Sequence, residues 1–107
     1  MKKSVLLTGI LALASISIAY AKSYSVSFPR ETQAGSVQLK SGSYDVKVDG
    51  DKAIFTDVNS SKKYSVPVKL ENAAKKFEYT KVETTNGGKA DVLKDIQLGG
   101  STTQVNF

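Results

Sequence analysis

The residues that could do chemistry in this 107-residue chain are carboxylates, hydroxyls, amines and five tyrosines, because the sequence contains no Cys, His or Trp. Without Cys and His the chain has no thiol nucleophile, no imidazole base and neither of the side chains that most often bind zinc. Most familiar enzyme mechanisms are therefore excluded. We expect a protein that is not an enzyme and that has no catalytic, cofactor-binding or metal-binding residue.

Three aspartates are spaced like oxygen ligands of calcium, namely Asp49, Asp51 and Asp57. An EF-hand loop that began at Asp49 would need a carboxylate at its twelfth position, where the sequence has Ser60. We interpret Asp49-Gly50-Asp51 as a solvated hairpin turn instead. The other acids stand mostly beside lysines, and nothing in their spacing indicates a pair in a desolvated cleft, as in a glycosidase.

Aromatic side chains form the remaining candidate site. At the mouth of a barrel their rings would stack on a hydrophobic or sugar ligand, and the tyrosine hydroxyls would orient it. The alternative is that the same side chains form the core and their hydroxyls reach its rim. The candidate ligand-lining residues are Tyr24, Tyr44, Phe55, Tyr64 and Tyr79.

The elements that position these residues begin after an export signal. Met1-Lys2-Lys3 precedes an apolar run over residues 5–19, and Ala19-Tyr20-Ala21 is a small-x-small cleavage site. We therefore predict a signal-peptide helix at residues 1–21 and a single mature β domain at residues 22–107, secreted or periplasmic. No membrane span is expected after cleavage, because no second hydrophobic segment follows, and the apolar run itself is shorter than the ~20 residues of a spanning helix.

Export also changes the net charge of the protein. Removal of Lys2 and Lys3 lowers the formal net charge from +5 to +3. The surviving lysines alternate with acids between Asp45 and Lys52, and Arg30 is the only arginine in the sequence. Nucleic-acid-binding domains gather Lys and Arg on one face, so we predict no nucleic-acid partner.

Apolar and polar residues alternate with a period of two along most of the mature chain, as is typical of strands with one buried face. Turn signals at Asp49-Gly50, Asn86-Gly87-Gly88 and Gly99-Gly100 separate the runs. We predict an all-β fold, an antiparallel meander of seven to eight short strands, arranged as a small barrel or a two-sheet sandwich. Residues 29–34 form the only link expected to be long enough to change sheets. The predicted strands are residues 23–28, 35–40, 43–49, 52–58, 62–70, 76–85, 89–98 and 102–107.

These turns also predict strand alignments. A two-residue loop at the first turn places Val46 opposite Ala53, and the same kind of loop at the third turn places Ile96 opposite Thr103. Around the second turn the apolar residues are out of phase, so one strand must carry a bulge near Lys81. The register of that hairpin stays open.

Two glycines differ in how strictly the predicted turns require them. A type I′ turn at Asp49-Gly50 needs a positive φ, so Gly50→Val is expected to cost about 1–2 kcal/mol. The turn at Ser41-Gly42 is less tightly specified. Gly42→Val is therefore expected to cost less.

Three blocks of sequence carry a resemblance: Ala34-Gly35-Ser36-Val37-Gln38-Leu39, Ser41-Gly42-Ser43-Tyr44-Asp45-Val46-Lys47-Val48 and Ile96-Gln97-Leu98-Gly99-Gly100-Ser101. With them the chain resembles a family of short, uncharacterised, secreted bacterial all-β proteins. The Gly-Ser-Tyr-x-Val-x-Val stretch within the second block also resembles a strand of prealbumin-like and carboxypeptidase-regulatory-like β-sandwich modules. Both resemblances imply a secreted β-module, and neither supplies a catalytic or binding residue.

These observations predict an exported, non-enzymatic β-module with a binding or structural role outside the cytoplasm. One alternative is a carrier of small hydrophobic ligands, with an interior pocket lined by the five aromatic residues. Another is a self-assembling surface subunit that donates residues 23–28 to a neighbour, because residues 29–34 isolate this strand from the rest of the domain. No ligand or partner follows from the sequence alone.

Overall fold

The computed structural model describes residues 22–107, which form ten β-strands in two sheets and no helix, so this part of the chain has no helix that could span a membrane. The predicted signal peptide, residues 1–21, lies outside the described residues. The predicted all-β fold is confirmed. The strands are β1 (Tyr24–Phe28), β2 (Thr32–Ala34), β3 (Val37–Leu39), β4 (Gly42–Asp49), β5 (Lys52–Asp57), β6 (Lys63–Pro67), β7 (Lys69–Asn72), β8 (Lys81–Asn86), β9 (Asp91–Gln97) and β10 (Thr103–Asn106).

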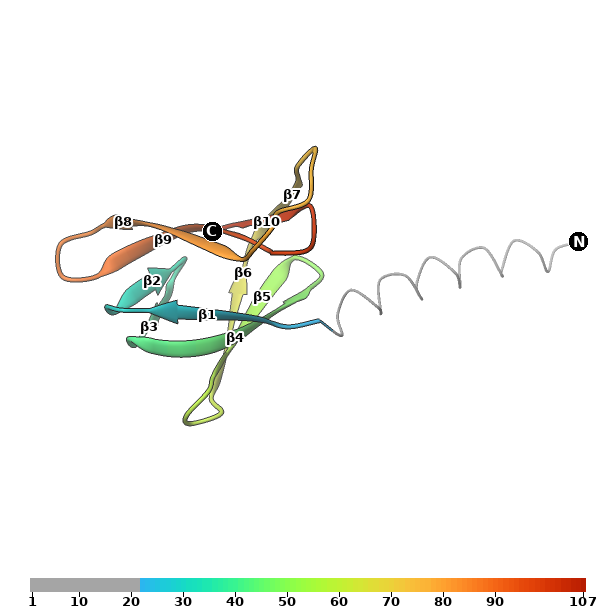
Figure 1. Cartoon of the computed structure of the whole chain (residues 1–107). Coiled ribbons are helices and arrows are strands. Elements are labelled where there is room, and N and C mark those ends of the chain that lie inside the picture. Colours follow the sequence, from blue (N-terminus) through green and yellow to red (C-terminus); the bar gives the residue numbers. More distant parts are fainter. Residues whose placement is uncertain (1–21) are drawn as a thin grey trace, which may run out of the picture.

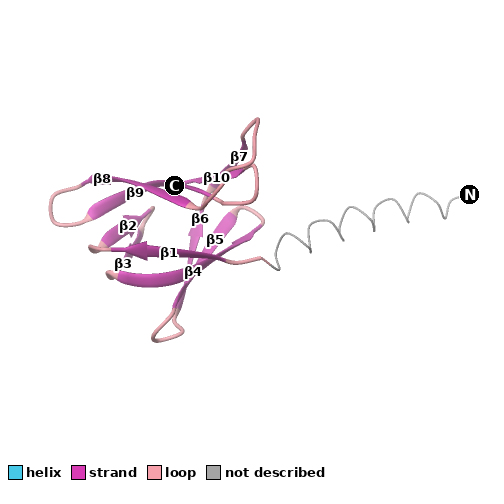
Figure 2. Ribbon diagram, in the orientation of Figure 1, coloured by secondary structure: helices cyan, strands magenta, loops and turns pink. Residues whose placement is uncertain are grey.

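The strands lie in two layers (Figures 1 and 2). The first sheet has the order β1-β4-β5-β6. The second has the order β3-β2-β9-β10-β7, and β8 pairs with the other edge of β9. Of the two predicted arrangements, the structure shows the sandwich-like one, with no closed barrel among the described strands.

There are ten strands rather than seven or eight because one predicted strand divides and a predicted link contains a strand of its own. Predicted strand 62–70 is β6 and β7, which belong to different sheets. Pro67 has no N–H to donate to a ladder, and the chain bends at Val68, whose amide donates to the Asp51 carbonyl at 2.8 Å. In addition, the link predicted at residues 29–34 contains β2.

The chain changes sheets three times: between β1 and β2, between β3 and β4, and between β6 and β7. The prediction that only residues 29–34 could serve was wrong, because a bend at the corner of a sandwich is enough. The second change takes Lys40 and Ser41 and ends at Gly42, which has a φ of 142°. The topology therefore departs from a plain meander, since β4 returns to pair with β1, and β2 pairs with β9 in parallel.

The only arginine connects the β1–β2 link to the β8–β9 turn. Arg30 Nη2 donates to the Gly88 carbonyl at 2.8 Å, and Nη1 lies 3.4 Å from Asp91 Oδ1. The Asp91 amide donates to the Glu31 carbonyl at 2.9 Å, and buried Thr32 donates through Oγ1 to the Arg30 carbonyl, also at 2.9 Å. These contacts join the early and late parts of the chain.

The predicted hairpins place side chains on the correct faces but are misaligned by two residues. Val46 of β4 pairs with Phe55 of β5 rather than with Ala53. Ile96 of β9 pairs with Val105 of β10, again two residues beyond the predicted partner. A shift of two keeps every side chain on its face, because the side-chain period of a strand is two.

The hairpin formed by β8 and β9 contains the predicted irregularity. Its register shifts between Glu83 and Thr84, whose partners are Asp95 and Leu93, so Lys94 is the extra residue. The hairpin therefore has a bulge, but at Lys94 of β9 and not near Lys81, which pairs regularly with Gln97. The out-of-phase aromatic residues precede β8 and belong to the loop before it.

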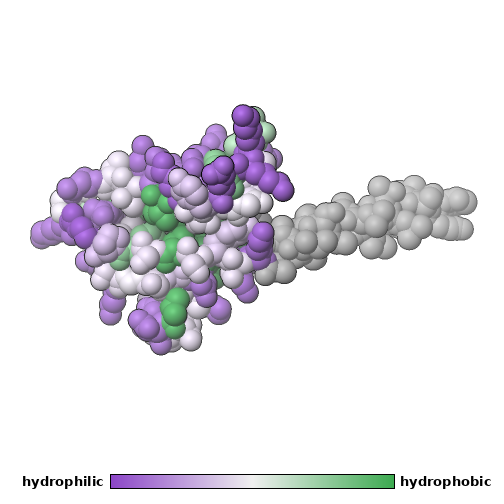
Figure 3. Space-filling model, in the orientation of Figure 1, coloured by the Kyte–Doolittle hydropathy of each residue, from purple (hydrophilic) through white to green (hydrophobic). Residues whose placement is uncertain are grey.

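The core lies between the two sheets and has an aromatic centre. Phe55 is fully buried, with its ring centroid 6.2 Å from that of Phe28, 6.3 Å from that of Tyr44 and 5.8 Å from that of Phe107. The Tyr44 hydroxyl donates to the Lys40 carbonyl at 2.7 Å, so this buried polar group is paired. Polar residues cover much of the face seen in Figure 3, where one hydrophobic area lies between the layers and smaller ones lie on the loops above and below.

Candidate functional site

The five aromatic residues predicted to line a ligand site divide between core and surface. Tyr44 packs edge-on against Phe55 and Tyr64, with ring centroids 6.3 and 6.4 Å apart, and burial raises the pKa of its hydroxyl. Tyr24 and Tyr64 are partly buried against the same core. Tyr79, by contrast, is 69% exposed. Four of the five therefore lie in the core or pack against it, and one lies at a surface pocket.

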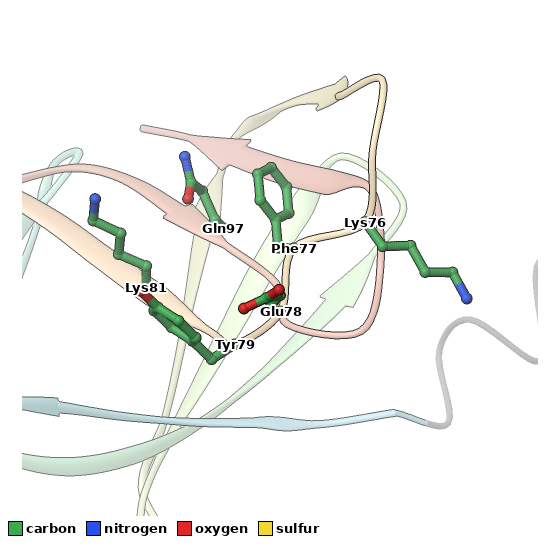
Figure 4. Close-up of a pocket in the computed structure, with 6 residues that line it drawn as sticks. All are labelled: Lys76, Phe77, Glu78, Tyr79, Lys81 and Gln97. Carbon is green, nitrogen blue, oxygen red and sulfur yellow. The ribbon is translucent and has the colours of Figure 1, made fainter.

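That pocket has a volume of about 280 Å³ and is called here the Tyr79 pocket. Figure 4 shows the side chains of Phe77, Lys81 and Gln97 pointing to the same side of the ribbon, with Glu78 and Tyr79 between Phe77 and Lys81, and Lys76 pointing away from the others. The pocket therefore combines aromatic rings with an amine, a carboxylate and an amide. Its lining residues are Lys76, Phe77, Glu78, Tyr79, Lys81 and Gln97.

The loop that carries the aromatic rings is held against the β9–β10 turn. The Phe77 amide donates to the Ser101 carbonyl at 2.8 Å, and the Gly100 amide donates to the Phe77 carbonyl at 2.7 Å. The Gly99 amide donates to Thr80 Oγ1 at 3.0 Å. The approach is close, because a Cβ added at Gly99 would lie 2.6 Å from the Thr80 nitrogen. These contacts fix the backbone on both sides of the exposed tyrosine.

Beside the pocket, the outer face of the second sheet carries a row of amide side chains. Ile96 and Val105 are fully buried and point into the core, so their neighbours along β9 and β10 point outward. Gln97 Nε2 donates to Gln104 Oε1 at 3.3 Å, and Gln104 Nε2 donates to Asn106 Oδ1 at 2.9 Å. The amide row therefore has defined orientations before any ligand binds.

The same face contains a carboxyl pair, Glu83 and Asp95, at opposite positions on β8 and β9. Asp95 is only 8% exposed, and its buried Oδ1 has no hydrogen-bond partner among the described residues. Burial, the hydrogen bond to Glu83 and the charge of Glu83 raise the pKa of Asp95, while Lys94 and Lys81 oppose the shift. A proton shared between the two carboxyl groups would give this buried oxygen a partner.

No sequence signal indicated this carboxyl pair, because the bulge creates it. In the register of Thr84 with Leu93, the residue opposite Glu83 would be Lys94, an ordinary cross-strand ion pair. The extra residue moves Asp95 into that place instead. Knowledge of the bulge position would have been needed to find the pair.

The three aspartates considered as calcium ligands do not form a site. Asp49 and Asp51 belong to the β4–β5 hairpin and its loop, and are exposed, as expected for a solvated turn. Asp57 Oδ1 accepts the Asn59 amide at 2.8 Å, and this hydrogen bond lowers the pKa of Asp57. Within residues 22–107, no three acidic side chains gather to hold a metal ion.

A second pocket, of about 480 Å³, lies where the chain passes from β6 to β7. None of the five predicted ligand-lining residues contributes to it. Its lining side chains are mostly apolar, with one amine and one amide. Its lining residues are Pro67, Val68, Lys69, Asn106 and Phe107.

The chain was compared with protein-family models, with curated proteins and with solved structures. None of the three comparisons finds a match. The resemblance to short secreted bacterial proteins and to prealbumin-like modules therefore stays a prediction. The candidate site depends on geometry and chemistry alone.

Proposed function

We propose that this protein is an exported, non-enzymatic binding module that holds its ligand in the Tyr79 pocket. The observation that supports this proposal is the exposed Tyr79 ring, which lies on a loop fixed to the neighbouring turn and lines the same pocket as Phe77. Exposure forgoes the favourable free energy of burying an aromatic ring. A ligand that covers the ring recovers it.

The surroundings of the ring suit recognition rather than catalysis. Lys81, Glu78 and Gln97 supply hydrogen-bond donors and acceptors around the aromatic surface. The sequence has no His or Cys to act as a base or nucleophile at neutral pH. The first sheet serves as the support, since its aromatic side chains are committed to the core.

Export is the part of the proposal that depends on the signal sequence. The charged start, the apolar run and the Ala19-Tyr20-Ala21 site support cleavage after Ala21. Cell fractionation followed by N-terminal sequencing is expected to find a chain that begins at Lys22 outside the cytoplasm. A cytoplasmic protein that retains residues 1–21 contradicts this location.

Binding is tested by substitution at the exposed ring. NMR titrations of the exported protein with fatty acids, neutral oligosaccharides and acidic oligosaccharides are expected to identify a probe whose binding Tyr79→Ala abolishes. Val58→Ala is the matched control, because Val58 is 55% exposed in the loop after β5, away from the pocket residues. Both variants should melt within a few degrees of wild type, since exposed side chains contribute little to stability. Binding that both variants retain, or the absence of any binding probe, contradicts the proposal.

The two alternatives receive less support. An interior carrier needs free aromatic surfaces, but Tyr44 and Phe55 are covered by each other and by Phe28. Strand donation needs β1 to leave its domain, but all five of its residues pair with β4, and Val26 and Phe28 are part of the core. A domain that lost β1 would lose both core side chains.

A further inference from the structure

We infer that the Tyr79 pocket takes a neutral, polyhydroxylated ligand, the pyranose ring of an uncharged sugar; this inference rests on the proposed function. The pocket volume of about 280 Å³ suits one ring rather than an extended chain. Three features of the lining support this class of ligand: balanced charge, paired donors and acceptors, and exposed aromatic surface.

The charge inside the pocket is balanced. Lys76 points away from the other lining side chains, which leaves Lys81 and Glu78 as one charge of each sign (Figure 4). An anionic ligand would meet the Glu78 carboxylate, and a cationic ligand would meet the Lys81 amine. An uncharged ligand avoids both penalties.

The polar groups match hydroxyls, which both donate and accept hydrogen bonds. The Lys81 amine can only donate, and the Glu78 carboxylate can only accept. Because Gln97 Nε2 already donates to Gln104 Oε1, the amide has one orientation, and Gln97 also carries Oε1 as an acceptor. Adjacent hydroxyls of a sugar can use such a set, whereas an alkyl chain would leave it without partners.

The aromatic rings match the other side of a sugar ring. A pyranose ring has a face of C–H groups that can lie against an aromatic ring while its hydroxyls point sideways. Tyr79 and Phe77 offer such surfaces next to the polar groups. This combination of stacking and hydrogen bonding distinguishes a sugar from a lipid.

The neighbouring amide row provides room for more than one sugar. Beyond Gln97, the side chains of Gln104 and Asn106 continue the polar outer face across β10. They are only partly exposed and already orientated, so binding orders few additional side chains. Affinity should therefore increase with the length of the oligosaccharide.

The test uses the exported protein labelled with ¹⁵N and a panel of soluble neutral oligosaccharides of one to six residues, with acidic oligosaccharides and a fatty acid alongside. We expect a neutral oligosaccharide to shift the side-chain amide signals of Gln97 and to bind more tightly as its length grows. Lys81→Met, which keeps the alkyl stem, should weaken binding at least tenfold. Lys47→Met is the control, because Lys47 is exposed on β4 of the other sheet and should leave binding unchanged.

The possible results distinguish failure of the sugar inference from failure of the proposed function. Binding of an acidic oligosaccharide or the fatty acid in preference to every neutral sugar, with loss of binding in Tyr79→Ala, overturns the sugar inference and leaves the proposed binding function intact. Absence of any probe that depends on Tyr79 overturns both. Equal effects of Lys81→Met and Lys47→Met also overturn the inference, because the amine would then act only through overall charge.

Discussion

The β4–β5 hairpin and the β8–β9 hairpin differ in what their side chains are used for. β4 and β5 pair without interruption over six residue pairs, and three large side chains, Tyr44, Val46 and Phe55, are fully buried. β8 and β9 contain a bulge and carry a carboxyl pair on their outer face. No residue of β8 is fully buried.

This difference shows how a small domain separates stability from recognition. A domain of this size has little core to spare, so one sheet carries the aromatic centre in regular pairs. The other sheet contributes fewer large side chains to the core and can therefore hold polar and exposed aromatic groups on its outer side. Substitutions in each of the two sheets test this separation of stability from recognition.

The largest expected effect is in the core. Phe55→Ala should lower the free energy of unfolding by about 3–5 kcal/mol, because it removes a ring that contacts three others. Total stabilities of about 5–15 kcal/mol make this change sufficient to unfold much of the protein. Phe77→Ala, in the loop before β8, should cost far less and weaken ligand binding. Urea unfolding curves measure both, and equal losses would mean that the loop belongs to the core.

The next largest expected effect is a difference in the stability cost of substituting Gly42 and Gly50, two glycines of the first sheet. Gly42 has a φ of 142°, outside the left-handed region that other residues can reach, whereas Gly50 has a φ of 64°, inside it. Gly42→Asn should therefore cost about 1–3 kcal/mol, and Gly50→Asn a few tenths. The valine variants should follow the same order, which reverses the order expected from the sequence. Thermal melts in which Gly50→Asn loses more than Gly42→Asn would contradict this account of the sheet change before β4.

The smallest effect concerns the carboxyl pair. The folded state raises the pKa of Asp95 above the ordinary value of 3.8, so between the unfolded and the folded pKa the folded protein binds a proton that the unfolded chain has released. The stability associated with the protonated Asp95 carboxyl is fully present below the unfolded pKa and is lost as pH rises through the folded pKa. Asp95→Asn should therefore stabilise the protein at pH 7 by about 1 kcal/mol, since the amide can donate to Glu83 without ionising.

Melting temperatures of Asp95→Asn and wild type should differ by about 4–8 °C at pH 7 and converge in acid. Asp45→Asn, at an exposed position on β4, is the control and should leave the melting temperature unchanged. Asp57 works in the opposite direction, because its lowered pKa favours folding above the unfolded pKa and loses this effect as pH falls. A constant difference between Asp95→Asn and wild type across pH would contradict the shared proton.

The sequence by itself determined the fold class, most strand positions and the face to which most strand side chains point. Alternation with a period of two is a local property, so it survives the two-residue errors in the alignments of Val46 and Ile96. Local turn chemistry also identified the solvated turn at Asp49-Gly50-Asp51. The bulge in the β8–β9 hairpin was predicted from aromatic residues that lie in the loop before β8, so the sequence pattern did not determine its position.

Only the tertiary structure decided which of these residues come together. The change of sheet at Val68, the parallel pairing of β2 with β9 and the position of the bulge all depend on contacts between distant segments. Of the five aromatic residues singled out from the sequence, four became core and Tyr79 became exposed, although all five look alike in a pattern of strand residues. Pairing partners and exposure depend on the free energy of the whole packed domain, and a single-strand pattern does not encode it.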